Sequence, residues 1–155
     1  MNQGVLGVDI GKVIIGGDND TSLFTANYLA TPPIQGAFEA LRYLTLEFSG
    51  RVYLVSKCSP RNEARTREWL RHRKVYEMTG IKESSVKFCR YREAKRDICV
   101  ELGITDFIDD RLENLNCLQG HVKNRYLFGS RKIKSIDGII YVESWEEAIK
   151  EIKKG

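Results

Sequence analysis

The stretch Val5–Ile10, which reads VLGVDI, decides the fold class of this chain of 155 residues. Its apolar residues have the length and pattern of a buried strand, and a carboxylate, Asp9, stands where that strand ends. Working outward, Gln35–Phe48 has the apolar spacing of a helix and Arg51–Ser56 has the pattern of a second strand. The N-cap pair Ser59–Pro60 begins another helix. The chain therefore opens as strand, helix, strand, helix.

The same alternation continues to the end of the sequence. Val86–Cys89 predicts a third strand, Glu93–Leu102 a helix, and Phe107–Ile108 a strand that runs directly into Asp109–Asp110. The remaining elements are a short helix at Leu112–Gln119, strands at Tyr126–Phe128 and Ile139–Val142, and a last helix at Trp145–Lys153. Such alternation predicts the α/β class: a single three-layer α/β/α domain over residues 1–155, with a parallel sheet and helices on both faces.

Composition places the chain among ordinary globular domains. With 42% hydrophobic and 30% charged residues, it is neither a disordered chain nor a coiled coil. Its longest apolar stretches, such as Gly138–Val142, are too short to cross a membrane, and the N-terminus has no signal-peptide pattern. We therefore expect a cytoplasmic protein with no membrane partner. The four cysteines form no Cys-x-x-Cys pair and there are two histidines, which argues against a zinc site and histidine-centred catalysis.

The net charge of +4 is unevenly distributed. Between Lys57 and Arg96 thirteen Lys or Arg stand against five Glu, a balance of +8, so the remainder carries −4. Solvated helix faces are one explanation, and a surface for polyanions is the other. The basic run Arg61–Lys74 contains one aromatic residue, Trp69, and no recognised nucleic-acid motif, so a nucleic-acid partner has weak support.

Polar residues stand at the carboxyl ends of the predicted strands, where ligands bind in open α/β sheets. They are Asp9, Ser56 with Lys57, and Asp109 with Asp110. Each alone has a structural explanation, such as capping. Together, carboxylates at one edge repel one another unless a cation compensates them, and Mg²⁺ is the cation that oxygen ligands suit best.

These residues resemble the motifs of the haloacid dehalogenase superfamily. The matching features are Asp9 after an apolar strand, Ser56 ending the next strand, Lys95 on the helix before Asp109–Asp110, and Asn114 four residues beyond. The resemblance covers nearly the whole chain, and Phe107–Asn114 is its most specific part. It implies a Rossmann-like topology and a phosphatase activity that passes through an aspartyl-phosphate.

The resemblance also implies a role for each residue. The nucleophile is Asp9, the phosphate ligands are Ser56 and Lys95 with the adjacent Lys57, the Mg²⁺ ligands are Asp9, Asp109, Asp110 and the carbonyl of Gly11, and Asn114 supports them. A phosphate ester is dianionic, so a carboxylate nucleophile approaches it only when cations neutralise both groups. Mg²⁺ and Lys95 would do so.

One position departs from the family pattern. Phosphatases of the family carry a second aspartate two residues after the nucleophile, where it protonates the leaving group, and this chain has Gly11 there. Loss of general acid-base assistance costs on the order of 10² to 10⁴ in rate. Asp18 and Asp20, in the turn that follows, are candidate replacement acids, although ordinary turn carboxylates are the plainer explanation.

The sequence leaves no room for the cap domain that family members usually carry. Water exclusion then falls to the substrate, which favours a large phosphorylated substrate or a partner protein. The expected function is Mg²⁺-dependent phosphoester hydrolysis. The alternative is a catalytically silent protein that binds phosphate and metal, and acts with an anionic macromolecule. Either function requires the Asp9 strand to lie between the strands that end at Ser56 and Asp109.

Overall fold

The computed structural model describes residues 2–16, 26–129 and 136–155, so Asp18 and Asp20 lie outside the described residues. Its strands are β1 (Leu6–Val8), β2 (Val52–Lys57), β3 (Val86–Cys89), β4 (Asp106–Asp109), β5 (Asn124–Phe128) and β6 (Ile139–Val142). They form one parallel sheet in the order β3-β2-β1-β4-β5-β6. This is the strand order of the doubly wound Rossmann-like fold, and it confirms the predicted α/β class.

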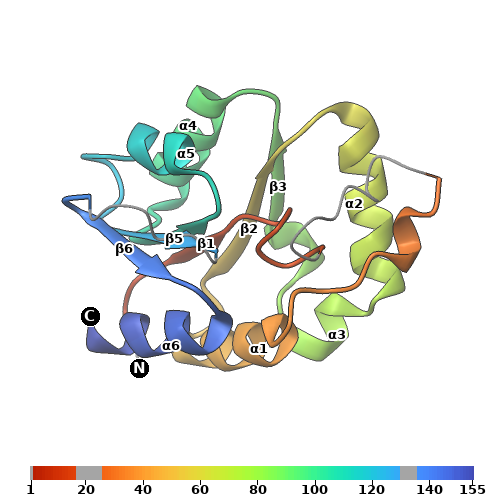
Figure 1. The fold of residues 1–155 in the computed structure, drawn as a ribbon, viewed down its shortest axis with the longest axis horizontal. Coiled ribbons are helices and arrows are strands. Elements are labelled where there is room, and N and C mark those ends of the chain that lie inside the picture. The colour runs from red at the N-terminus through yellow and green to blue at the C-terminus, as the bar shows by residue number, and fades with distance from the viewer. Residues whose placement is uncertain (1, 17–25, 130–135) are drawn as a thin grey trace.

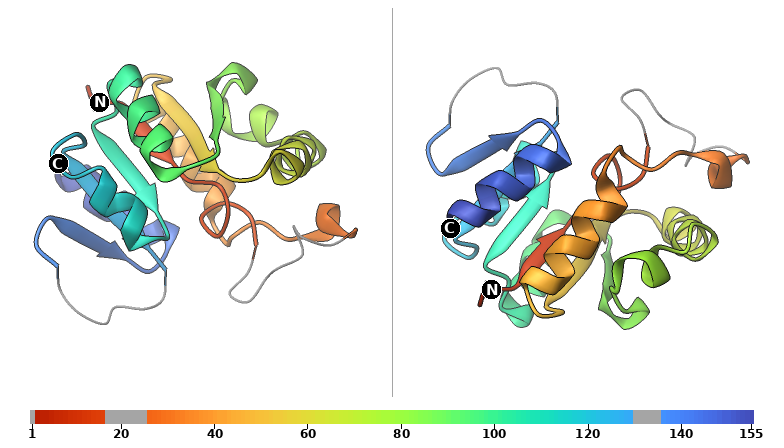
Figure 2. Two further views of the ribbon diagram at one scale, coloured as in Figure 1. Left: turned by 90° about the horizontal axis from the view of Figure 1, so that it is seen from above. Right: turned by 90° about the horizontal axis from the view of Figure 1, so that it is seen from below.

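Helices cover both faces of this sheet (Figures 1 and 2). They are α1 (Ala37–Glu47), α2 (Pro60–His72), α3 (Val75–Thr79), α4 (Arg92–Leu102), α5 (Leu112–Cys117) and α6 (Trp145–Lys154), with short 3-10 helices η2 (Tyr28–Ala30) and η3 (Glu83–Ser85). Two apolar clusters result. One joins the sheet to α1, α3, α6 and the buried face of α2, and the other joins it to α4 and α5. The arrangement therefore has three layers.

The helix boundaries follow local signals. Ser59 begins α2 by accepting a hydrogen bond from the N–H of Asn62 at 3.2 Å, and Ser144 begins α6 in the same way. The first helix begins at Ala37 and not at Gln35, because Gly36 has the left-handed φ of 79°. Helix α5 is shorter than predicted, since its end tightens to bonds between residues three apart.

A short helix, α3, was missing from the sequence prediction. It has five residues, begins after Lys74 in a left-handed conformation with φ 58°, and ends at Gly80 with φ 85°. Five residues are too few for a recognisable apolar period. It packs against α1 and α2, so the stretch between β2 and β3 belongs to the layers of the domain. None of the helices described here has the length and apolar character needed to cross a membrane.

The register of the central strands brings the candidate residues to one edge. Val8 of β1 lies beside Leu54 of β2 on one side and beside Ile108 of β4 on the other. Strand β1 is thus central, as predicted, between the strands that carry Ser56 and Asp109. Because all three strands are parallel, their carboxyl ends meet in the same place.

Candidate active site

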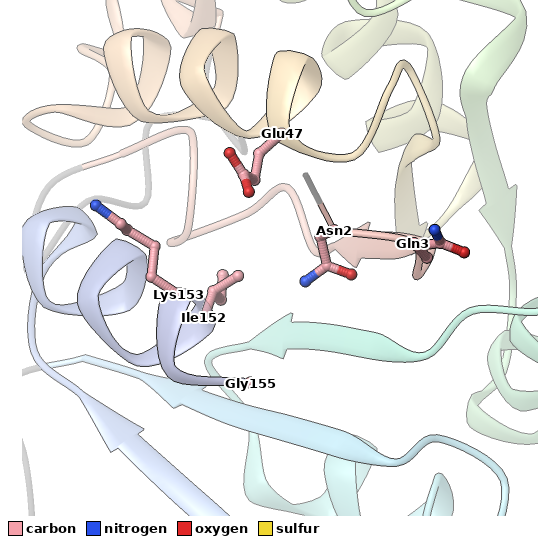
Figure 3. Close-up of a pocket in the computed structure, with 6 residues that line it drawn as sticks. All are labelled: Asn2, Gln3, Glu47, Ile152, Lys153 and Gly155. Carbon is pink, nitrogen blue, oxygen red and sulfur yellow. The ribbon is translucent and has the colours of Figure 1, made fainter.

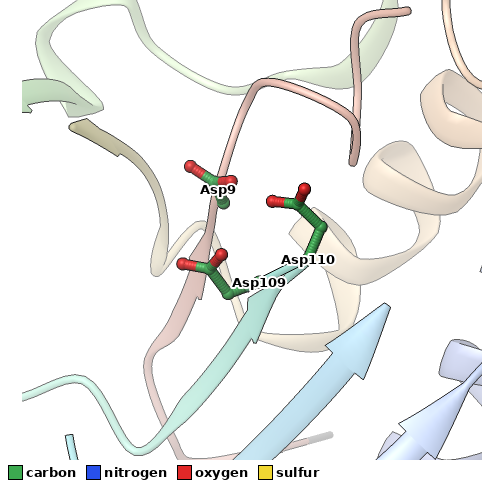
Figure 4. Close-up of side chains that lie close together, drawn as sticks. All are labelled: Asp9, Asp109 and Asp110. Atoms are coloured by element: carbon green, nitrogen blue, oxygen red, sulfur yellow. The ribbon is translucent and has the colours of Figure 1, made fainter. Parts of the chain in front are cut away.

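Three carboxylates gather at the carboxyl edge of the sheet. Asp9 follows β1, Asp109 ends β4 and Asp110 comes next, and their nearest oxygens all lie within 4.8 Å of one another. Asp9 and Asp109 are buried, whereas Asp110 is half-buried. Figure 4 shows the three side chains close together at the ends of the two strands. The predicted cluster of acidic residues is therefore present in the fold.

Lys95 reaches this cluster from α4. Its Nζ lies 3.1 Å from Oδ1 of Asp9 and 2.7 Å from Oδ2 of Asp109, and the side chain is 1% exposed. The ammonium group has three N–H donors, and these two carboxylates occupy two of them. One donor is left for a ligand, so Lys95 can hold the two aspartates and still bind an anion.

Charge in the site is unbalanced. Three carboxylates face one buried ammonium, and burial raises the pKa of both Asp9 and Asp109 to about 6 against the attraction of Lys95. The neighbouring carboxylates, Asp110 for Asp9 and Asp9 for Asp109, raise these pKa values further. Burial alone would lower the pKa of Lys95, but Asp9 and Asp109 more than offset it and raise that pKa. The ionised site would carry an excess of two negative charges, which a divalent cation would neutralise.

Asp109 is held on every side. Its oxygens accept from Lys95, from the backbone N–H of Arg111 at 3.0 Å, and from Nδ2 of Asn114 at 3.1 and 3.3 Å. Nε of Arg92 in turn donates to Oδ1 of Asn114 at 3.2 Å. This chain of contacts fixes Asp109, while Asp110 keeps more freedom to bind a ligand.

Two of these groups, Arg92 and the Arg111 N–H, were missing from the sequence prediction. Arg92 precedes Lys95 by three residues, which places both on one face of a helix and was an available signal. The N–H of Arg111 carried no signal, because every residue except proline has such a donor.

Ser56 and Lys57 differ in their placement. Ser56 is buried near the end of β2, two residues beyond the pairing of Leu54 with Val8, and thus close to the loop that follows Asp9. Lys57 is exposed, and successive side chains of a strand point to opposite faces. Among the described residues Lys57 has no contact with the carboxylates, and its phosphate-binding role stays a prediction.

Gly11 lies in the tight turn after Asp9. The N–H groups of Ile14 and Ile15 both donate to the carbonyl of Ile10, and Lys12 adopts the left-handed φ of 63°. Gly11 itself is not left-handed, and a Cβ built on it would meet no atom within 4 Å. The backbone here does not demand glycine, so a side chain could be added.

A cavity elsewhere in the fold contains neither Lys95 nor any of the three clustered aspartates. It has a volume of about 330 Å³ and lies near the amino end of β1 (Figure 3). Its lining residues are Asn2, Gln3, Glu47, Ile152, Lys153 and Gly155. It lies at the edge of the sheet opposite to Asp9, and we do not assign the site to it.

Comparison with known proteins supports the fold. No protein-family model matches the chain, and no curated protein matches it. A solved structure, that of DsGPDH of Dunaliella salina, is similar over 94% of this chain with a TM-score of 0.61 and 15% sequence identity. The chain spans 28% of the length of that protein. At this identity the likeness shows the α/β fold and nothing more specific.

Proposed function

We propose that this chain is a Mg²⁺-dependent phosphoester hydrolase of the haloacid dehalogenase type, with Asp9 as its nucleophile. One observation carries the proposal: Asp9, Lys95, Asp109 and Asp110 come from three separate elements and converge at the carboxyl edge of the sheet. A domain that needed only stability gains little from burying two carboxylates against one lysine with a third carboxylate beside them. The resemblance of the sequence motifs supports the same assignment.

In the proposed reaction, a carboxylate oxygen of Asp9 forms a bond to phosphorus while the ester P–O bond breaks. The electron pair of that bond leaves with the alcohol oxygen. Water then cleaves the aspartyl-phosphate, which releases inorganic phosphate and restores Asp9. Lys95 holds one oxygen of Asp9 and donates its remaining N–H to the phosphoryl group, and the hydroxyl of Ser56 holds another phosphoryl oxygen.

The residues present fit a Mg²⁺ ion. Asp9, Asp110 and the carbonyl of Gly11 would hold it, with Asp109 beside them, because hard oxygen donors are what Mg²⁺ prefers. Mg²⁺ would neutralise charge between the phosphate and Asp9. The excess of two negative charges in the ionised site is the independent support for this choice.

The decisive experiment measures release of inorganic phosphate from an aryl phosphate with and without Mg²⁺. An aryl ester is the right probe, because its leaving group departs as a stable anion and does not need the acid that Gly11 lacks. We expect turnover in the wild type that requires Mg²⁺ and is lost in Asp9→Asn. If Mg²⁺-dependent turnover is absent, or survives in Asp9→Asn, the chain is not this enzyme.

A second candidate function rests on Gly11. A protein that has lost its general acid can keep the phosphate and metal pocket as a binding site without turnover. Binding of inorganic phosphate and Mg²⁺ with no hydrolysis of the aryl ester would establish that function in place of the enzyme.

The metal site makes a prediction for thermal stability at different pH values. The folded-state pKa of Asp9 and Asp109 is about 6, above the usual 3.8, so their ionisation lowers the stability of the metal-free protein as pH rises from about 4 through 6. Mg²⁺ competes with these protons. We therefore expect millimolar Mg²⁺ to raise Tm by several degrees at pH 7.5, and by much less at pH 5.

Differential scanning fluorimetry of wild type and Asp110→Asn tests this prediction. The variant should lose most of the Mg²⁺ response, because Asp110 is the least buried of the three carboxylates and a proposed ligand of the ion. Glu146→Gln, at an exposed position on α6, is the matched control and should respond as the wild type does. An equal Mg²⁺-induced rise in Tm in wild type and Asp110→Asn would show that Asp110 is not a metal ligand.

A further inference from the structure

Five cations follow the ends of the four strands nearest the carboxylates. Lys12 lies after β1, Lys57 ends β2, Arg90 and Arg92 follow β3, and Arg111 follows β4. Adjacent members are tied together by the fold: Lys57 pairs in register with Cys89, and Nη1 of Arg90 donates to the carbonyl of Cys58 at 3.2 Å. We call these five residues the cationic rim.

Most of the rim is available for an anion. Arg90 pairs with Glu63 at 2.8 Å. Arg92 uses Nε for Asn114, and its two Nη groups have no hydrogen-bond partner in the described part of the chain. In that same part, Lys12, Lys57 and Arg111 form no ion pair with a carboxylate. In the residues that the structure describes, four cations of the rim thus have no carboxylate within ion-pair distance, although the charge of Arg111 also acts on Asp110.

Most of the arginines on and just after α2 already have partners within the protein. Arg67 pairs with Glu63 at 3.0 Å, Arg71 pairs with Glu83, and Arg73 donates to the backbone carbonyls of Leu29 and Thr31. These partners stabilise the fold and leave less charge for a ligand. The rim is the better anion surface.

An exposed aromatic residue stands between two residues of the rim in the sequence. Tyr91, between Arg90 and Arg92, is 62% exposed and is the residue that precedes the first turn of α4. The other large hydrophobic residues found exposed in the described part of the chain are aliphatic or Met, namely Leu46, Met78 and Val100. An exposed aromatic ring is a surface on which an unpaired nucleic-acid base can stack.

From these observations we infer that the substrate is the phosphorylated end of a single-stranded nucleic acid, with its terminal phosphate at Asp9, its backbone on the cationic rim and a base on Tyr91. The inference rests on the proposed function and names its substrate class. A nucleic-acid strand presents a phosphate at every nucleotide and can meet several rim cations at once. A phosphopeptide presents one phosphate and has no base for Tyr91.

The test measures binding of a fluorescent oligothymidine, phosphorylated at its 3′ or its 5′ end, to the Asp9→Asn protein with Mg²⁺. Fluorescence anisotropy should show affinity well above that for inorganic phosphate. With about four phosphates contacted, affinity should fall roughly fiftyfold between about 50 and 200 mM salt. A phosphoserine peptide of equal net charge should bind at least tenfold more weakly, to judge from the stacking it lacks.

Substitutions at exposed positions locate the surface. Tyr91→Ala should weaken oligonucleotide binding about tenfold, whereas Tyr91→Phe, which keeps the ring, should stay within about twofold. Arg111→Ala should weaken binding. It should also make the slope of log affinity against log salt concentration shallower, by the amount expected for one phosphate contact. Lys123→Ala is the matched control, since Lys123 is exposed at the amino end of β5, and it should bind as the parent protein does.

The outcomes separate this inference from the proposed function. Equal binding by Tyr91→Ala and its parent, or equal affinity for the phosphopeptide, would overturn the nucleic-acid assignment even if aryl phosphate is hydrolysed. Tight Tyr91-dependent binding without any Asp9-dependent hydrolysis would overturn the enzyme and leave a nucleic-acid end-binding protein. The nucleic-acid inference and the proposed enzyme function are both supported if the wild type releases phosphate from the oligonucleotide with a higher kcat/KM than from the aryl ester.

Discussion

Replacing Gly11 by aspartate is expected to raise kcat/KM for an alkyl phosphate on the order of 10² to 10⁴, and to change kcat/KM for an aryl phosphate by about tenfold at most. An alkoxide is a poor leaving group, so the alkyl ester needs a proton as its P–O bond breaks. An aryl oxide leaves without one. Steady-state kinetics on one ester of each kind, for wild type and Gly11→Asp, measure the difference.

The structure has room for a side chain at position 11. A side chain at Gly11 starts in open space, with no atom within 4 Å of its Cβ, and the backbone there has no left-handed conformation to strain. The new carboxyl would stand two residues beyond Asp9, at the start of a turn that is held by hydrogen bonds to Ile10. The variant should therefore fold without steric strain at this position.

Two controls make the result specific to proton donation. Gly11→Asn has nearly the same shape and no acid, so it should leave the alkyl ester slow. Asp9→Asn combined with Gly11→Asp should be silent on both esters. An efficient wild-type reaction with the alkyl ester would show that another group donates the proton and that our explanation of Gly11 is mistaken.

Much of this fold was predictable because strand and helix signals are local. The apolar stretches Val5–Val8 and Phe107–Ile108 are each followed directly by an aspartate, and strand ends in a parallel sheet share one edge. That geometric rule was enough to place Asp9, Ser56 and Asp109 together. The five-residue helix α3 escaped prediction because it is shorter than any apolar period.

The contacts inside the site were less predictable, because they depend on side-chain direction in three dimensions. Lys95 was expected to hold phosphate, and the structure adds that it is buried between Asp9 and Asp109. Lys57 follows Ser56 in the sequence, yet the alternation of a strand turns their side chains apart. The cationic rim joins the loops after four strands, so no single stretch of the sequence contains it.

Lys95→Met should destabilise the fold by about 3 to 5 kcal/mol at pH 8, which lowers Tm by about 10 °C for a chain of this size. Among the residues that the structure describes, Lys95 is the buried cation that pairs with Asp9 and Asp109, and its loss leaves two buried carboxylates without that partner. Thermal unfolding measures the effect. Lys150→Met is the control. Lys150 pairs with Glu146 on the surface and both side chains are largely exposed, so this change should alter stability by less than about 1 kcal/mol.

The sign of the pH dependence identifies the cause of this loss. In wild type the pKa of Asp9 and Asp109 is already about 6, and removal of Lys95 takes away the attraction that lowers it. In the variant these folded-state pKa values rise further, so stability is lost as pH rises through a higher range. Destabilisation should thus be smallest near pH 5, where the carboxyl groups are protonated, and largest above pH 7.

Adding Asp109→Asn to Lys95→Met removes one unpaired charge and should recover part of the stability at pH 8, which a double-mutant cycle quantifies. A loss that is the same at pH 5 and pH 8, with no recovery in the double variant, would mean that Lys95 stabilises the fold by packing and not through the two carboxylates.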